Sequence, residues 1–549
     1  MDYKELSELL FPDITLTMED YEKKYPERNL KEGAKVTRIA PSPTGFMHLG
    51  NLFGAITDER LAHLSDGVFY LRIEDTDLKR QVEGGVETII KVFDQFGLKF
   101  DEGVTLDGEK GDYGPYRQRQ REKIYKTYAK HLVKEGLAYP CFCTEEELSD
   151  MRSKQEANKE NFGYYGKYAK YRDFPIDEAA KKVKDGVPYV LRFKSFGNPE
   201  NKIKHTDLIK GLIEMPENDQ DIVLLKSDGI PTYHFAHVID DHLMRTSVVV
   251  RGEEWLATLP IHIQLFDTLG FKKPKYAHTA QLMKMDGESK RKLSKRKDPE
   301  LALSYYSEVG YPVPSVIEYL LTLLNSNFEE WRIANPKEDY NKFNFTTKKM
   351  SVSGSLFDID KLRDVSKNVV AVMDAKEVYD YVTKWAKEYD KEFFELLNRD
   401  AKYATDIFAI GRGGKKPRKD IAVWSEVKDY MGFFYDELFD EKYDYPENLN
   451  KEDILSILNC YVSSYQERED MNDWFNDICE VGAKFGFAKT TKDYKENPDL
   501  YKGNPGDVSQ VIRVAITGRQ NSPDLYTVMN ILGKDRVIKR LEKAIKGVK

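Results

Sequence analysis

The chain has 549 residues, of which 32% are charged and 40% hydrophobic, and its formal net charge is -8. A chain of this length is expected to form several domains around a large buried core. It contains no run of about 18 apolar residues, so no membrane span is expected. The acidic balance argues against indiscriminate binding of DNA or RNA, although a local basic surface is still compatible with it.

The first 34 residues are charged and helix-prone and carry no motif. The opening MDYKELSELLF has neither a basic leader nor a long apolar stretch, which predicts that it is not a signal peptide. The chain has four cysteines, too few for a disulfide framework at this length, as is typical of a reducing compartment. We therefore expect a cytoplasmic protein.

Between residue 35 and about residue 300, β-branched segments alternate with helical stretches. The expected strands are KVTRIA (35–40), VFYLRIE (68–74), PYVLRF (188–193), DIVLLK (221–226) and TSVVVR (246–251). Strands separated by helices favour parallel pairing in an α/β sheet. Beyond about residue 300 helical patterns dominate, as in 313–325, 376–389 and 451–465. The sequence thus predicts an α/β part followed by a mostly α-helical part.

The segment VTRIAPSPTGFMHLGNL (36–52) is an expected strand that Pro41 and Pro43 interrupt before a helix-like stretch. Gly45 and Gly50 allow the backbone to approach another group closely. Alone, this pattern is typical of an ordinary strand-to-helix loop. It is also compatible with a nucleotide site, because the first N–H groups of a helix bind phosphates.

The segment SKRKLSKRKDPE (289–300) is strongly basic, and Gly287 precedes it. A run of charge usually marks a solvated surface. A mobile lysine-rich loop could, however, close over a triphosphate and stabilise negative charge during its displacement. Together with the glycine turn of 36–52, the basic segment favours a nucleotide site.

With these residues the chain resembles the class I aminoacyl-tRNA synthetases, and within them the glutamyl-tRNA synthetases of the glutamyl and glutaminyl branch. HLGN (48–51) stands where that class has its HIGH motif, and KLSKR (292–296) where it has KMSKS. Further similar segments are RIAPSPTG (38–45), LRIEDTD (71–77), DYGPYRQ (112–118), PTYHFAHVIDDHLM (231–244), RGEEWL (251–256), FDIDKL (357–362) and 513–544. The resemblance therefore covers nearly everything after residue 35.

The resemblance implies a multidomain protein with a Rossmann-like α/β catalytic domain, an inserted domain and a helical anticodon-binding region. The implied boundaries are an N-terminal extension (1–34), the first catalytic half (35–115), the inserted tRNA acceptor-end domain (116–221), the second catalytic half with the KMSKS-like loop (222–300), a connecting region (301–345) and the anticodon-binding region (346–549).

The implied activity is that of a ligase. It activates L-glutamate with ATP and Mg²⁺ to glutamyl-adenylate and transfers it to the terminal adenosine of tRNA-Glu, and the family suggests a monomer. The implied ATP-binding residues are His48, Gly50, Asn51, Glu254, Trp255, Lys292, Leu293, Ser294 and Lys295, of which His48, Asn51, Lys292 and Lys295 are the implied catalytic residues. Asn51 departs from the class, which has a second histidine there, but its amide can still donate a hydrogen bond.

Glutamate offers a side-chain carboxylate, which a guanidinium pairs bidentately. Arg38 and Arg251 lie at or near strand ends, at the carboxyl edge where α/β sheets bind ligands, which favours a pocket over a surface salt bridge. By resemblance the glutamate-binding residues are Arg38, Ala40, Ser42, Glu74, Tyr233, His237 and Arg251, with Glu74 facing the amine. His237 departs from the family, which commonly has asparagine there, and the charge of a histidine varies near neutral pH.

Three alternatives are less consistent with the residues. A glutaminyl-tRNA synthetase lacks an arginine at the position of Arg251. The truncated relative that glutamylates a modified tRNA nucleoside ends soon after the KMSKS loop, whereas about 250 residues follow it here. A catalytically silent RNA-binding relative should have lost the histidine, the lysines or the arginines. Whether the enzyme charges only tRNA-Glu or also tRNA-Gln stays open.

Structural zinc is not expected. Cys141 and Cys143 form a C-x-C pair, but the segment 163–171 supplies no further cysteine or histidine, and two thiolates do not complete a tetrahedral site. Cys460 and Cys479 lie far along the helical part.

An acidic protein that binds tRNA needs its basic residues gathered. The turn GRGGKKPRKD (411–420) qualifies, as does the amphipathic closing helix 533–549, which could equally be a solvated face. We favour RNA contact for the turn because no helical scaffold pairs its side chains. The expected tRNA-binding residues are Arg412, Lys415, Lys416, Arg418 and Lys419, with Arg519 in an exposed loop.

Overall fold

The computed structural model describes residues 1–294 and 296–548, which form two compact units. The first unit comprises Met1–Tyr305 and Ile317–Asp358, and the second comprises Tyr306–Val316 and Ile359–Lys549. The domain boundaries expected from the sequence are finer than this division and stay predictions. No helix among the described residues is long and apolar enough to cross a lipid bilayer.

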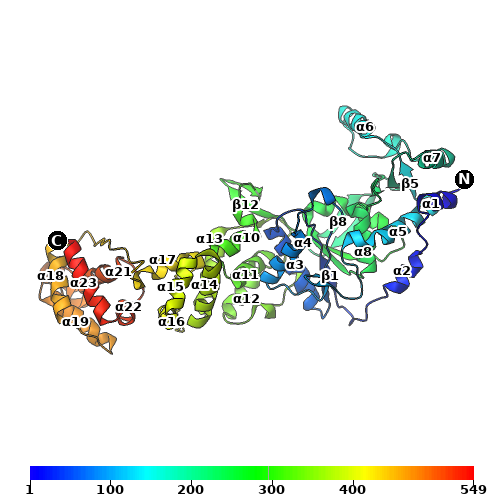
Figure 1. Ribbon diagram of the computed structural model, residues 1–549. Coiled ribbons are helices and arrows are strands. Elements are labelled where there is room, and N and C mark those ends of the chain that lie inside the picture. Colours follow the sequence, from blue (N-terminus) through cyan, green and yellow to red (C-terminus); the bar gives the residue numbers. More distant parts are fainter. Residues whose placement is uncertain (295, 549) are drawn as a thin grey trace. The chain divides into compact units, whose positions relative to one another are not determined.

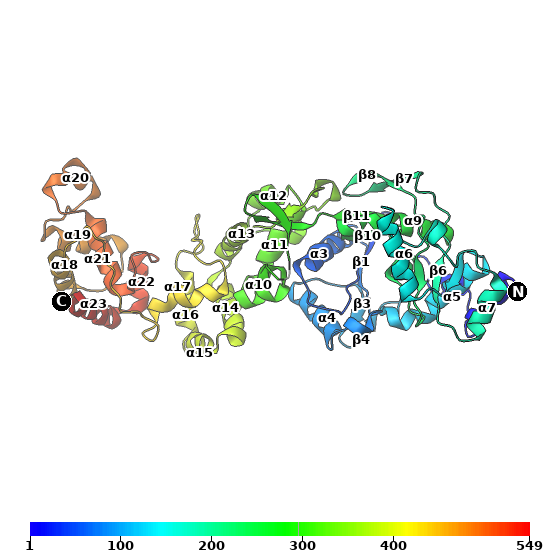
Figure 2. The same ribbon diagram turned by 90° about the horizontal axis from the view of Figure 1, so that it is seen from above.

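The first unit is built on a parallel sheet. Strands β1 (Val36–Ile39), β2 (Val68–Leu71) and β3 (Glu102–Thr105) pair in parallel, and so do β10 (Val248–Gly252) and β11 (Lys275–Thr279). β10 lies beside β1, where the Ser247 N–H donates to the Val36 carbonyl at 2.9 Å. Helix α3 (Leu49–His63) packs on β1, β2 and β10 (Figure 2). The predicted parallel pairing is thus confirmed for the strands at 35–40, 68–74 and 246–251.

The other two expected strands belong to an antiparallel sheet. β5 (Ala138–Cys141), β6 (Val190–Phe193) and β9 (Val223–Leu225) pair antiparallel, which corrects the parallel pairing expected for 188–193 and 221–226. The helices between β5 and β6, α6 (Glu145–Ala157) and α7 (Ile176–Lys184), do not carry the chain across the sheet as a parallel crossover would. They lie at the outer end of the insertion (Figure 1).

The amino-terminal segment has a defined place in the first unit. Its helices α1 (Tyr3–Leu10) and α2 (Met18–Lys24) pack against α5 (Glu122–Lys134). The Tyr25 hydroxyl donates to the Gly114 carbonyl at 2.8 Å, and Arg28 pairs with Glu102 through two hydrogen bonds of 2.7 and 2.9 Å. The segment therefore links α5 to the β3 edge of the parallel sheet.

The second unit is helical. Its main helices are α13 (Ile359–Val372), α14 (Ala375–Tyr389), α15 (Lys391–Arg399), α16 (Ala401–Ala409), α18 (Lys451–Ser464), α19 (Met471–Ala483), α21 (Pro505–Thr517), α22 (Leu525–Leu532) and α23 (Lys534–Val548). Figure 1 shows α14, α15 and α16 side by side, and α18, α19, α21 and α23 packed together in orange and red. Val537, Leu541 and Ile545 of α23 are buried in the common core, as the amphipathic pattern predicts.

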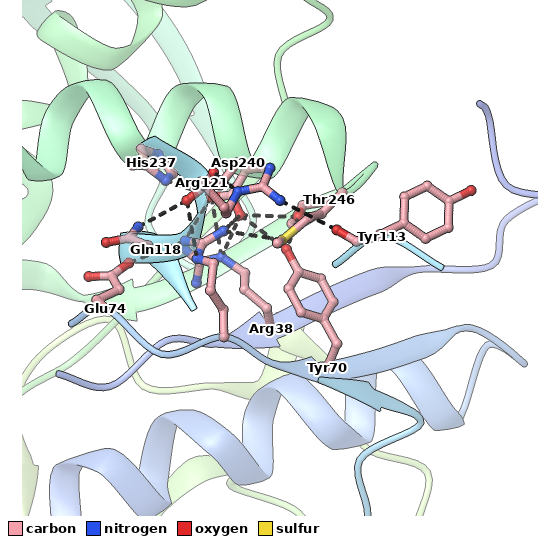
Figure 3. A network of polar contacts seen from close by, with 12 residues as sticks. Arg38, Tyr70, Glu74, Tyr113, Gln118, Arg121, His237, Asp240 and Thr246 are labelled. Atoms are coloured by element: carbon pink, nitrogen blue, oxygen red, sulfur yellow. Dashed lines mark hydrogen bonds and ion pairs between the residues drawn. The ribbon is translucent and has the colours of Figure 1, made fainter. Parts of the chain in front are cut away.

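Two adjacent aspartates on helix α8 (Tyr233–Leu243) hold the first unit together, and both are fully buried. Asp240 accepts hydrogen bonds from Gln118 at 3.0 Å, Arg121 at 2.6 Å and Tyr125 at 2.8 Å (Figure 3). These donors lie in residues 118–125, just before and at the start of α5. Asp240 thus ties the start of α5 to α8.

Asp241 accepts hydrogen bonds from Arg38 at 3.0 Å and from Arg72 at 2.8 Å. Arg38 is on β1, and Arg72 directly follows β2. Burial by itself would raise the pKa of Asp241, but the two guanidinium groups hold it well below its usual range. The carboxylate therefore stays charged, and a buried charge is tolerated only with such partners.

Four histidines of the first unit lie in or next to the core: the half-buried His234 and the buried His237 on α8, the buried His262 on α9 (Leu259–Thr268) and the buried His278 on β11. Burial is the main cause that lowers their pKa values, to about 4 for His234, to about 3 for His237, and well below the usual value for His262. All four imidazoles are accordingly neutral at pH 7.

Replacing Asp241 should destabilise the first unit. Asp241→Ala leaves Arg38 and Arg72 buried without their carboxylate, so we expect a loss of about 3–5 kcal/mol in the free energy of unfolding, measured with urea. Lys31→Ala removes the exposed Lys31–Asp66 ion pair of the same unit and should leave the free energy of unfolding in urea nearly unchanged. Equal shifts for both variants would contradict the role given to Asp241.

The buried histidines predict a pH dependence of stability. Because their folded pKa values lie below the ordinary 6.5, the unfolded chain binds protons first as pH falls. The contribution of His234 and His237 is full above pH 6.5 and should be lost towards pH 4 by about 1.4 kcal/mol per pH unit for each of the two. His237→Asn should reduce this slope in unfolding curves. His63→Asn should not, because a hydrogen bond to Asp101 raises the pKa of His63.

Candidate functional site

A cavity of about 520 Å³ opens at the carboxyl ends of β1 and β10 in the first unit. It brings together most of the residues predicted from the sequence. From the predicted ATP site it includes His48, Gly50, Asn51, Glu254, Trp255, Lys292 and Leu293, and from the predicted glutamate site Arg38, Ala40, Glu74, Tyr233 and Arg251. The two predicted sites therefore share one cavity, as two reacting substrates require.

The HLGN segment forms the start of α3. His48 is the residue that precedes the helix, and its backbone N–H donates to the Asn51 side-chain oxygen at 3.0 Å. Asn51 thus closes the first turn, and its amide nitrogen is the group that can face the cavity. A Cβ atom at Gly50 would lie only 3.1 Å from Nδ1 of His48. Glycine therefore leaves room for the imidazole at the positive end of the helix.

The basic segment 289–300 begins in a short antiparallel hairpin. Its first part is strand β13 (Ser289–Lys292), which pairs antiparallel with β12 (Leu282–Asp286). Asp298 then anchors the turn, since it accepts from Arg291 at 2.6 and 2.8 Å and from the Ser294 N–H at 2.8 Å. Lys292 lines the cavity but Ser294 does not. Lys295 lies outside the described residues.

Arg251 ends in the cavity with one of its nitrogens unpaired. Its Nε donates to Nε2 of His278 at 3.0 Å, and its Nη1 to Nδ1 of His262 at 3.0 Å. Its Nη2 is buried and has no hydrogen-bond partner among the described residues. Arg38 also lines the cavity, but its guanidinium donates hydrogen bonds to the Asp241 carboxylate. Arg251 is therefore the arginine that can receive an anionic group of a ligand.

Glu74 places a carboxyl group in the same cavity as Arg251. It accepts a hydrogen bond from Arg72 at 3.2 Å. Burial raises the pKa of Glu74 even though Arg72 opposes the shift. An ammonium group in the cavity would favour the ionised carboxylate. The Tyr233 ring contacts two other rings of the site. Its centroid is 4.5 Å from that of Trp255 and 5.7 Å from that of His237, with which it stacks.

Two predicted glutamate-binding residues do not line the cavity. Ser42 is exposed on the loop after β1. His237 is fully buried beneath Tyr233, with Nδ1 at 2.5 Å from Asp241 and Nε2 at 3.0 Å from the Tyr276 hydroxyl. Its imidazole thus contacts Asp241, and any influence on a ligand passes through its neighbours.

Sequence reasoning missed several residues of the site. Gln281, Thr279 and Phe53 line the cavity without belonging to a recognised pattern. The two buried aspartates belong to the segment PTYHFAHVIDDHLM, but no sequence signal marked them as buried. Nothing in the sequence connects His262 and His278 with Arg251.

Several of the candidate tRNA-binding residues already have hydrogen-bond partners within the protein. The Arg412 guanidinium donates to the carbonyls of Phe408 at 2.7 Å and of Val370, and Arg418 pairs with Asp420, so the expectation that the turn lacks partners fails for these two. Arg519 donates to the Asp429 carbonyl at 2.7 Å. Lys415, Lys416 and Lys419 of the turn are exposed.

The C-x-C pair lies at the end of β5. The thiols of Cys141 and Cys143 lie 3.4 and 3.5 Å from the Tyr164 hydroxyl. Within the described part of the chain, no group of three or more histidine, cysteine, aspartate or glutamate side chains is arranged to hold a metal ion.

Comparisons with known proteins identify the family. Residues 35–364 match the model of the catalytic domain of tRNA synthetases class I (E and Q), and residues 414–545 match an anticodon binding domain. A glutamate–tRNA ligase of Acetivibrio thermocellus is 55% identical over 546 residues, covering 99% of this chain and 100% of that protein. One of Clostridium beijerinckii is 52% identical over 549 residues, covering 99% of each.

A solved structure agrees with the sequence comparisons. The crystal structure of a glutamate tRNA ligase from Elizabethkingia meningosepticum, in complex with its amino acid, has a TM-score of 0.73 and 28% identity, covering 94% of this chain and 100% of that one. Since the catalytic-domain model matches more than half of the sequence and the relatives match it from end to end, the chain belongs to the class I tRNA synthetases (E and Q).

Proposed function

We propose that this chain is a glutamate–tRNA ligase, which joins L-glutamate to tRNA with ATP. The observation that carries the proposal is Arg251, a buried guanidinium whose Nη2 is unpaired in the cavity beside the start of α3. Such a group fits a side-chain carboxylate better than an uncharged amide. The relatives that match the whole chain and are named glutamate–tRNA ligases support the same activity.

In the first step an oxygen of the glutamate α-carboxylate attacks the α-phosphorus of Mg²⁺-bound ATP. The bond between this phosphorus and the bridging oxygen breaks, and pyrophosphate leaves with that oxygen. Arg251 and Glu74 orient the amino acid, while His48, Asn51 and Lys292 face the nucleotide. Positioning and charge stabilisation suffice for this reaction, so no protein nucleophile is needed.

In the second step a ribose hydroxyl of the terminal adenosine of the tRNA attacks the glutamyl carbonyl, and AMP leaves. We place the enzyme in the cytoplasm, where translation takes place, and expect it to act as a monomer. The helical second unit would bind the anticodon end of tRNA-Glu, and assays on both tRNA-Glu and tRNA-Gln decide whether one or both are charged.

ATP–pyrophosphate exchange tests the proposed function. The wild-type enzyme should exchange pyrophosphate in the presence of glutamate and tRNA-Glu, and no exchange would reject the proposal. Lys292→Ala should lower kcat on the order of 10²-fold, because it removes a cation from the cavity, with little change in the KM for glutamate. Lys290→Ala, on the same face of β13 but outside the cavity, is the matched control.

The exposed lysines of the 411–420 turn predict a contact with tRNA. Replacing Lys415, Lys416 and Lys419 together by alanine should raise the KM for tRNA several-fold. It should also reduce the slope of log KM against log salt by about 0.7 for each lysine that contacts a phosphate. The KM values for ATP and glutamate should change little.

The control for this variant replaces three exposed lysines of α14, Lys376, Lys384 and Lys387, and so makes the same change of net charge in the same unit. If both triple variants behave alike, the turn is a solvated loop without a contact to tRNA.

A further inference from the structure

The two arginines of the cavity are held in opposite ways. Arg38 is paired with the carboxylate of Asp241, so its charge is compensated within the protein. Arg251 is held by two imidazoles, His262 and His278, and no carboxylate in the described part of the chain forms an ion pair with it. Both arginines are almost completely buried, with 4% of Arg38 and 8% of Arg251 exposed.

The protonation of the two imidazoles follows from their partners. The guanidinium group can only donate hydrogen bonds. The histidine nitrogens that face Arg251 must therefore accept these hydrogen bonds and carry no proton. The proton of His278 is then on Nδ1, 2.7 Å from the Asp207 carboxylate, and that of His262 is on Nε2, 2.9 Å from Nδ1 of His234. Burial lowers the pKa of both imidazoles, which agrees with this assignment.

Arg251 consequently keeps its full positive charge at a buried place. A buried charge without a counter-ion is costly, and an incoming carboxylate would remove that cost. A neutral amide can accept one hydrogen bond from Nη2 but leaves the charge uncompensated. A carboxylate at position 262 or 278 would cancel the charge before the ligand arrives.

We propose that His262 and His278 are positioning residues that determine the charge specificity of the cavity. Two neutral imidazoles fix the Arg251 guanidinium without compensating its charge, so that the cavity takes an amino acid with a carboxylate side chain and rejects the corresponding amide. This inference rests on the proposed function and extends it to residues outside the cavity lining.

The test compares two isosteric variants of His262 that differ only in charge. His262→Asn keeps an acceptor near the position of Nδ1, whereas His262→Asp adds a carboxylate next to Arg251. We measure kcat and KM for glutamate, the ratio of kcat/KM for glutamate to that for glutamine, and the KM for ATP. The asparagine variant should stay within about threefold of the wild type. The aspartate variant should lose about tenfold or more in the glutamate-to-glutamine ratio, through KM for glutamate, with KM for ATP unchanged.

A second pair keeps the test decisive if the aspartate variant does not fold. His278→Gln can present an oxygen to Nε of Arg251, whereas His278→Leu cannot. The leucine variant should raise the KM for glutamate about tenfold, and the glutamine variant should largely restore it. His63→Asn, in the same unit but away from the cavity, controls for the loss of a histidine, and thermal unfolding checks each fold.

The outcomes separate this inference from the proposed function. If the variants of each pair behave alike while the wild type activates glutamate, the histidines serve only the fold and the inference is wrong. If the wild-type enzyme does not activate glutamate, the proposed function is wrong, and the inference falls with it.

Discussion

The burial of two adjacent carboxylates, Asp240 and Asp241, is the constraint on which the first unit depends. Each is fully removed from water, and each must therefore be met by cations or other donors. Arg121 reaches Asp240 from the residue before α5, and Arg38 and Arg72 reach Asp241 from β1 and from the residue after β2. Segments more than a hundred residues apart are thus fixed around α8 by charge as well as by apolar packing.

This network also shapes the cavity. Asp241 engages Arg38, and Arg72 in turn donates to Glu74, so these groups meet a ligand already oriented. Arg251 lies outside the network and is held by imidazoles instead of carboxylates. The cavity thereby combines a compensated arginine, a buried carboxylate and an uncompensated arginine, an arrangement that fits a zwitterion with an additional negative charge.

The nucleotide side of the cavity depends on local geometry. The start of α3 brings the His48 imidazole and the Asn51 amide to the cavity, and Gly50 leaves the space that the imidazole occupies. On the other side, β12 and β13 form a hairpin, and Asp298 fixes the turn after it. A short strand thus presents Lys292 to the cavity in a defined position.

The sequence by itself predicted the alternation of strands and helices and the helical second unit, because these depend on local signals, and its resemblance to the class I synthetases implied most of the cavity residues. Pro41, Gly50 and the lysines of 289–300 are visible in a single stretch of chain. Only the tertiary structure decided that 188–193 and 221–226 pair antiparallel, that His237 lies beneath the cavity, and that Arg412 caps carbonyls. It also decided which histidines hold Arg251, because His262 and His278 come from different elements and hydrogen bonds across such distances leave no periodic trace in a sequence.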